Sequence, residues 1–256
     1  MPKLHRLFLL PALVAALLSA GCAGLRTAAV PMPTDLYTAN CASAATTLVV
    51  MLPGASSTTD EFVREGFVQQ LRERRIAADV LLADAHMGYY NGRSIVARLE
   101  ADVLEPARAR GYNAIWLLGI SVGGFGALLH EEAIPGRIAG LVLLAPYLGQ
   151  RPLTDEISRA GGLGAWKAPS GNLPAEDTDA MLWRWLQGYG ATASSAGRPP
   201  LYLGYGISDR FAPSHRLLAA ALPAGQVFTT PGGHDWGPWR ALWEQMLAAL
   251  PLPRCG

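Results

Sequence analysis

Three residues of the types that act together in nucleophilic catalysis occur at separate points of the chain. Ser121 is the centre of the sequence GISVG over residues 119–123. In this pattern the glycines leave room for a sharp turn between a strand and a helix, and the turn exposes the serine hydroxyl. Asp209 and His234 follow in the segments GISDR and GGHDW. A serine needs a base, usually a histidine oriented by a carboxylate, so the three predict acyl transfer through Ser121.

The elements that must position these residues are predicted by hydrophobic patterning. Apolar runs typical of buried strands occur at residues 46–53, 78–84, 113–120, 137–146, 200–206 and 226–230. Helical periodicity occurs at residues 60–75, 94–110, 122–133, 214–221 and 239–250. This alternation predicts a mostly parallel sheet with helices on both faces. Ser121, Asp209 and His234 each follow a strand, so we expect them at the same edge of that sheet.

Residues 147–198 interrupt the alternation and predict a cap-like insertion over the sheet, placed after the strand that follows the helix at 122–133. The insertion includes a glycine-rich stretch and a helix near 175–188. Trp166 and Trp183 are candidates for an apolar acyl pocket or lid. The alternative is that a tryptophan here packs in the insertion's own core.

The segment after the second strand supplies further candidates for substrate binding. His86, Tyr89 and Tyr90 follow residues 78–84 and are expected on the same side of the sheet as Ser121. Tyrosine hydroxyls there could reach polar atoms of a substrate. The alternative is an ordinary loop with one packed tyrosine.

From residue 45 to residue 250 the sequence resembles the α/β-hydrolase superfamily, through the elbow GISVGG and the segments GISDRFAP and GGHDW. The ending HDWGPW is similar to the histidine region of the esterase D and mycolyltransferase branches. The resemblance implies an oxyanion hole made by the N–H of Val122 and that of Ala55 or Gly54. The chain differs from many members after the first strand, where it has Leu-Pro-Gly-Ala-Ser in place of His-Gly.

The activity implied is that of a serine hydrolase that cleaves carboxylic esters, with a small-molecule or lipid ester as substrate. Because a histidine base must be neutral, we expect activity to fall below about pH 6. One alternative is an envelope acyltransferase with the same triad. Another is a non-catalytic lipoprotein that binds a lipid or partner. The sequence has no metal-ligand spacing and no dinucleotide or phosphate loop, so no cofactor or metal is expected.

The first residues have the pattern of an export signal. Residues 1–21 contain a short basic region, an apolar run and small residues before Cys22, and this ending resembles a bacterial lipobox. The resemblance implies a lipid anchor on Cys22 and a place in the bacterial cell envelope, on the outer membrane or periplasmic side. Plain cleavage and an uncleaved anchor are the alternatives. Residues 22–44 are interpreted as a tether and residues 45–256 as the hydrolase domain.

Two cysteines remain for the exported part of the chain. Cys41 lies before the first strand and Cys255 next to the C-terminal residue. An even pair in an oxidising compartment predicts a disulfide bond that joins the two ends of the domain. The alternative is two free thiols at frayed ends.

Composition excludes several other classes of protein. The 256 residues carry a formal net charge of +1, which argues against nucleic acid as the main partner. Half of the residues are hydrophobic and 16% are charged, so the chain is not intrinsically disordered. No repeat of solenoid length is present.

Overall fold

The computed structural model describes residues 26–174, 177–190 and 197–256, which contain a seven-stranded sheet in the order β1-β3-β2-β4-β5-β6-β7. Strand β1 is antiparallel to β3, and each of the other neighbouring pairs is parallel. The strands are β1 (Thr34–Tyr37), β2 (Thr47–Leu52), β3 (Ala78–Ala83), β4 (Ala114–Ile120), β5 (Gly140–Leu144), β6 (Leu201–Gly206) and β7 (Val227–Thr230). The predicted fold class, a mostly parallel sheet with helices, is confirmed.

The central strands are buried on both faces, which explains why they are continuous apolar runs rather than alternating ones. All residues of β2, β3, β5 and β6 are buried, and so are all but the first of β4. The register pairs Leu52 of β2 with Gly119 of β4, and Ile120 of β4 with Leu144 of β5. The carboxyl ends of these three strands therefore lie side by side, and Ser121 follows directly.

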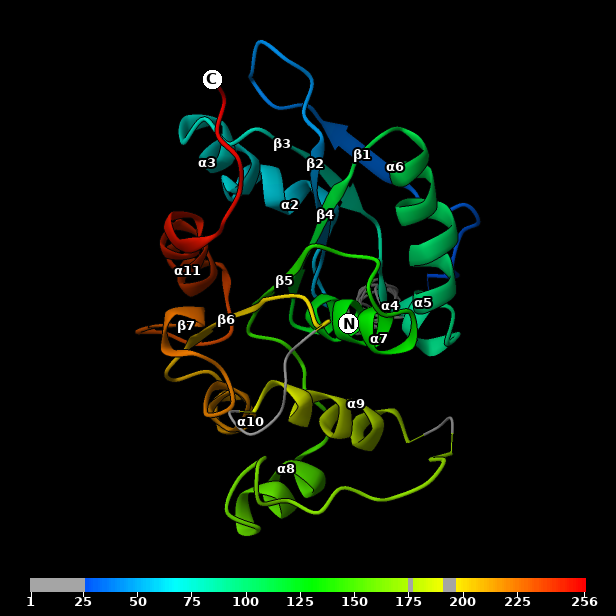
Figure 1. Cartoon of the computed structure of the whole chain (residues 1–256), viewed down its shortest axis with the longest axis vertical. Coiled ribbons are helices and arrows are strands. Elements are labelled where there is room, and N and C mark those ends of the chain that lie inside the picture. The colour runs from blue at the N-terminus through cyan, green and yellow to red at the C-terminus, as the bar shows by residue number, and fades with distance from the viewer. Residues whose placement is uncertain (1–25, 175–176, 191–196) are drawn as a thin grey trace, which may run out of the picture.

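Helices cover both faces of the sheet, as Figure 1 shows. Two separate hydrophobic cores result, one on each face. The first face is covered by α5 (Ile95–Arg98), a π-helical stretch (Leu99–Leu104), α6 (Glu105–Ala109) and α7 (Val122–Ala133). The second face is covered by α2 (Thr59–Arg64), α3 (Phe67–Glu73) and α11 (Trp236–Ala249). Between β6 and β7, α10 (Ala212–Ala219) packs on the first core.

Two predicted helices differ in detail from the structure. The helix expected over residues 60–75 is two helices, because Gly66 adopts a left-handed φ of 80° between α2 and α3. The helix expected over residues 94–110 is continuous but passes through the π-helical stretch. Pro106 follows that stretch and has no N–H for the helical ladder, a feature that favours irregular hydrogen bonding in the preceding turn.

The tether expected over residues 22–44 is corrected for its described part, residues 26–44, which pack on the domain. Strand β1 extends the sheet, and Met32 is buried. Carboxylates fix the segment on both sides of β1: Asp102 accepts from the N–H of Met32 at 2.9 Å, and Asp79 accepts from that of Ala39 at 2.7 Å. An edge strand needs only backbone pairing, so its side chains are largely exposed and give no strong apolar pattern.

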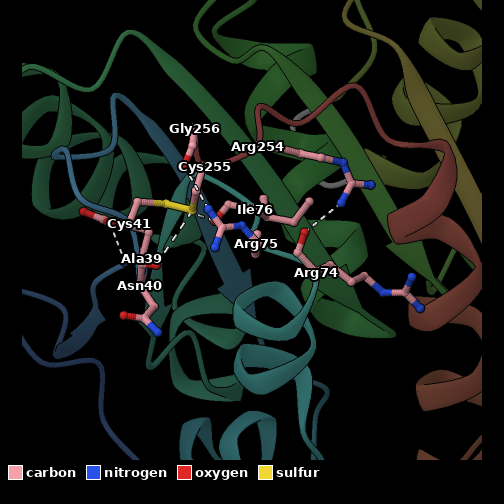
Figure 2. The surroundings of a disulfide bond; sticks show 10 residues. Ala39, Asn40, Cys41, Arg74, Arg75, Ile76, Arg254, Cys255 and Gly256 are labelled. Atoms are coloured by element: carbon pink, nitrogen blue, oxygen red, sulfur yellow. Dashed lines mark hydrogen bonds between the residues drawn. A yellow bond between two sulfur atoms is a disulfide. The ribbon is translucent and has the colours of Figure 1, made fainter.

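Cys41 and Cys255 form a disulfide bond that joins chain segments 214 residues apart, as Figure 2 shows. Hydrogen bonds hold the same end of the chain. The N–H of Cys255 donates to the carbonyl of Arg75 at 2.7 Å, and the Arg75 guanidinium donates to the carbonyl of Gly256 at 2.8 Å. The described segments before β2 and after α11 are thus joined beside the start of β3.

The insertion carries α8 (Arg151–Arg159) and α9 (Thr178–Leu186), which Figure 1 shows beyond one end of the sheet. Residues 1–21 and Cys22 lie outside the described residues, so the export signal and the lipid anchor stay predictions. Among the helices that the structure describes, none is long and apolar enough to cross a membrane.

Candidate active site

Ser121 lies at the turn between β4 and α7, in a backbone conformation that few residues adopt. Its φ is 54° and its ψ is −116°, outside the regions that L-residues favour. A Cβ on Gly119 would lie 2.4 Å from the backbone of Gly123, and a Cβ on Gly123 would lie 2.2 Å from the carbonyl oxygen of Leu52. Neither position has room for a side chain. The turn therefore requires both glycines of the GISVG pattern, and it places Ser121 at the start of α7, where 8% of its surface is exposed.

Asp209 and His234 meet Ser121 although 113 residues separate the serine from the histidine. The His234 Nε2 lies 2.9 Å from the Ser121 Oγ, and the His234 Nδ1 lies 2.7 Å from the Asp209 Oδ2. Both distances are those of good hydrogen bonds. With Nδ1–H donated to Asp209, Nε2 is free to accept the serine proton. The geometry is that of a nucleophile, a base and a carboxylate that orients the base.

The Asp209 carboxylate is held in its ionised form by two donors. Its side chain is fully buried, and burial by itself raises the pKa of a carboxyl group. The hydrogen bond with His234 and a 2.8 Å bond from the Phe211 N–H act in the opposite direction. Together they hold the pKa of Asp209 below its ordinary value, so the negative charge that stabilises a protonated His234 is present at neutral pH.

Aromatic rings fix the orientation of the His234 imidazole. Phe211 packs against it edge-to-face with ring centroids 5.2 Å apart, and Trp239 does the same at 5.2 Å from α11. Such edge-to-face contacts stabilise beyond the area they bury. The imidazole is thereby held between two rings while its two nitrogens face Ser121 and Asp209.

The predicted oxyanion donors lie beside Ser121. Val122 is the first residue of α7, and an N–H in the first turn of a helix has no carbonyl partner within that helix. The Gly54 backbone passes close to the serine, because a Cβ on Gly54 would lie 3.6 Å from the Ser121 Cβ. A turn closed by a 3.1 Å bond from the Ser57 N–H to the Gly54 carbonyl exposes Ala55 at its tip. Backbone N–H groups of two segments can thus converge on one oxygen.

A cavity of about 820 Å³ lies between the elbow and the insertion. Phe125 and Tyr147 line this cavity. Their N–H groups donate to the Ser121 carbonyl at 3.2 and 2.9 Å. Tyr90 and Trp166 also line it. A second cavity of about 690 Å³ shares Tyr147 with the first and reaches Phe211. The substrate candidates Tyr90 and Trp166 therefore line a cavity that also includes two residues hydrogen-bonded to the Ser121 carbonyl.

The other three substrate candidates are packed elsewhere, and their expected role is corrected. His86 accepts at Nδ1 from the Gly88 N–H at 3.1 Å and caps α4 (Met87–Asn91). The Tyr89 hydroxyl donates to the Ala29 carbonyl at 2.9 Å, and the residue is fully buried. Trp183 is fully buried in the first core and donates from Nε1 to the Leu148 carbonyl at 2.6 Å.

Three aromatic residues at the site are not among the sequence candidates. Phe125, Tyr147 and Phe211 form a row of edge-to-face contacts, with centroids 5.3 and 6.0 Å apart, that leads to His234. Spacing could have indicated two of them. Phe125 lies one helical turn after Ser121, and Tyr147 directly follows the strand predicted at 137–146.

His215 lies behind the site, on the helix that follows Asp209. It is completely buried on α10, and its Nε2 donates to the Pro146 carbonyl at 2.8 Å, while its Nδ1 has no partner among the described residues. Burial lowers the pKa of His215 to about 4. The bond to Pro146 and the charge of Asp209 oppose this shift, whereas His234 and Arg216 add to it.

The lowered pKa predicts a stability that depends on pH through His215. An unfolded histidine takes up a proton near pH 6.5, but folded His215 does so only near pH 4, so stability is lost as the pH falls between these values. We expect the difference in unfolding free energy between the parent and His215→Gln to shrink by about 3 kcal/mol from pH 7 to pH 4. Urea unfolding at both pH values measures it, and subtracting the variant cancels other titrating groups. A difference that stays constant with pH would contradict the prediction.

No family model matches the chain, and no curated protein matches it significantly. Solved structures do. The fluorophosphonate-binding serine hydrolase F of Staphylococcus aureus is 16% identical, with coverage of 88% of this chain and 95% of that chain and a TM-score of 0.57. Est1E from Butyrivibrio proteoclasticus is 18% identical over 84% and 93% of the two chains, with a TM-score of 0.56.

The S-formylglutathione hydrolase of S. aureus is similar at 16% identity over 80% of each chain, with a TM-score of 0.53. At these identities the likeness concerns the path of the backbone. Together with the sheet order and the strand–turn–helix at Ser121, it shows that the chain adopts the α/β-hydrolase fold.

Proposed function

We propose that the protein is a serine hydrolase that cleaves carboxylic esters through an acyl-enzyme on Ser121. The observation that carries the proposal is the position of His234, which is within hydrogen-bond distance of both the Ser121 hydroxyl and the Asp209 carboxylate. The solved structures with the same fold include proteins named as a serine hydrolase and as an S-formylglutathione hydrolase, and these names agree with it.

The first half of the reaction forms the acyl-enzyme. The Ser121 Oγ attacks the ester carbonyl as His234 Nε2 takes its proton, and the Asp209 carboxylate stabilises the imidazolium. The N–H groups of Val122 and the Gly54–Ala55 segment bind the oxyanion of the tetrahedral intermediate. His234 then gives its proton to the alkoxide, the carbonyl–oxygen bond breaks, and the alcohol leaves.

The second half releases the acid. His234 takes a proton from water, which attacks the acyl carbonyl, and the collapse of the second tetrahedral intermediate returns that proton to Ser121. The acyltransferase expected as an alternative differs only here, because an alcohol replaces water. Nothing in the described site favours an alcohol over water, so hydrolysis is the function proposed.

Labelling with a fluorophosphonate probe tests the proposal, because the probe phosphonylates only a serine whose hydroxyl is activated. We expect the parent protein to label and Ser121→Ala not to label. Ser158→Ala, which removes an exposed serine on α8, is the matched control and should label like the parent. Unlabelled parent protein with an intact circular dichroism spectrum, or labelling that survives in Ser121→Ala, would refute an activated Ser121.

A further inference from the structure

A narrow groove runs along the helix that begins at the elbow. It has a volume of about 380 Å³, and its walls come from α5, α7 and α9. Phe125 and Leu129 contribute the α7 wall, Met181 lies across from them on α9, and Val96 lies on α5. All four side chains are only partly buried, and Val96, Phe125 and Leu129 pack against the first core. Apolar side chains that line a groove in this way are suited to an apolar guest.

The groove adjoins the cavity of about 820 Å³, because Tyr90, Phe125 and Thr178 line both spaces. Phe125 is also bonded through its N–H to the Ser121 carbonyl. Phe125, which lines both spaces, therefore lies one helical turn from the nucleophile.

The direction and length of the groove follow from the helix. Residues four apart lie on one face, so Ser121, Phe125, Leu129 and Ala133 form a row along α7. Glu132 and Ala133, which also line the groove, lie near the end of that helix. At 1.5 Å per residue, Glu132 is about 16 Å along the axis from Ser121. The groove is thus long, apolar beside Phe125 and Leu129, and charged where Glu132 and Arg93 line it.

We infer that this groove binds the acyl chain of the substrate, and that the protein prefers esters of medium-length straight-chain acids over acetate. The inference rests on the proposed function, since the chain is positioned by its ester bond to Ser121. Each methylene moved from water into the groove favours the bound state by a factor of about four. The gain ends where the chain meets the charged group of Glu132, so the preference has an upper limit of length.

The test is a chain-length series of p-nitrophenyl esters, from acetate through butyrate and octanoate to hexadecanoate. For the parent protein we expect kcat/KM to rise at least tenfold from butyrate to octanoate and to fall again at hexadecanoate. Leu129→Trp and Met181→Trp fill the groove from opposite walls. Each should lower the ratio of octanoate to acetate turnover at least tenfold and leave acetate turnover within about twofold.

Leu36→Trp enlarges an exposed apolar side chain on β1 and is the matched control, with no expected change in the ratio. Acetate turnover and circular dichroism show whether each variant is folded. If one blocking variant fails to fold, the other still tests the inference. Equal turnover of butyrate and octanoate by the parent would overturn the inference. An unchanged ratio of octanoate to acetate turnover in both folded blocking variants would do the same. In either case, cleavage of acetate that depends on Ser121 would leave the proposed function intact. If Ser121→Ala cleaves every ester as the parent does, the proposed function fails, and the inference falls with it.

Discussion

Ester hydrolysis falls by about 10⁴-fold or more in kcat/KM when Ser121 is replaced by alanine, and by a comparable factor in His234→Ala. The reason is that the two residues act as one unit, joined by the 2.9 Å contact between His234 Nε2 and the Ser121 Oγ. Without the base the serine stays a weak nucleophile, and without the serine the base has nothing to activate. The double variant should therefore lose little more than either single variant. Steady-state kinetics with p-nitrophenyl butyrate measures all three.

Two neighbouring acids supply the control for this prediction. Asp209→Asn removes the charge that orients His234, and we expect it to cost about 10³- to 10⁴-fold. Asp235 is adjacent to His234, but its side chain accepts from the Gly237 N–H at 3.1 Å and caps α11. Asp235→Asn should therefore change kcat/KM only a few-fold. Additive losses in the Ser121–His234 double variant would contradict the assigned catalytic roles. Equal effects of Asp209→Asn and Asp235→Asn would also contradict them.

The placement of the three residues was predictable because each lies in the loop that follows a strand. Ser121 follows β4, Asp209 follows β6 and His234 follows β7, and parallel strands present their carboxyl ends at one edge. The glycine pattern around Ser121 added a local requirement that few other turns have. The aromatic rings around His234 were not predictable, because Phe211 and Trp239 converge on it from different elements, and no spacing in the sequence records that contact.

His86 and Tyr89 show why the same argument failed elsewhere. They also follow a strand, but the sheet order β3-β2-β4 places β3 two positions away from the strand that carries Ser121. At about 4.8 Å per strand, the chain after β3 emerges roughly 10 Å to the side. There His86 and Tyr89 are packed at and in α4, which brings Tyr90 and Asn91 to the cavity. Strand order depends on the whole chain, so local pattern could not reveal it.

The edge strand β1 escaped prediction for a related reason. Its four residues pair through their backbones with β3, and three of the four are exposed, so their side chains do not show the strand. What holds the segment is polar: carboxylates of Asp79 and Asp102 accept from N–H groups on either side of it. Proline and small residues in this segment suggested a linker, which composition alone does not distinguish from an edge strand.

Loss of the bond between Cys41 and Cys255 should lower the unfolding free energy by about 5 kcal/mol, because the bond closes a loop of 214 residues. In the chain-entropy model such a loop restricts the unfolded state more than a short one does. The folded state should change little, since backbone bonds such as Ala77 N–H to the Pro253 carbonyl, at 2.8 Å, hold the C-terminal segment. Urea unfolding of the parent and of the double variant Cys41→Ser/Cys255→Ser gives the difference.

Activity provides the complementary measurement, because the disulfide and the candidate active site lie at opposite ends of the strands. Cys41 precedes β2 and Cys255 is bonded to Arg75, which precedes β3, whereas Ser121 follows the carboxyl end of β4. Well below its unfolding transition, the serine variant should therefore keep the kcat/KM of the parent. A reductant should destabilise the parent and leave the variant unchanged. A loss of unfolding free energy under 1 kcal/mol would show that the disulfide bond does not act mainly on the unfolded chain. Reduced turnover by the folded double variant would show the same.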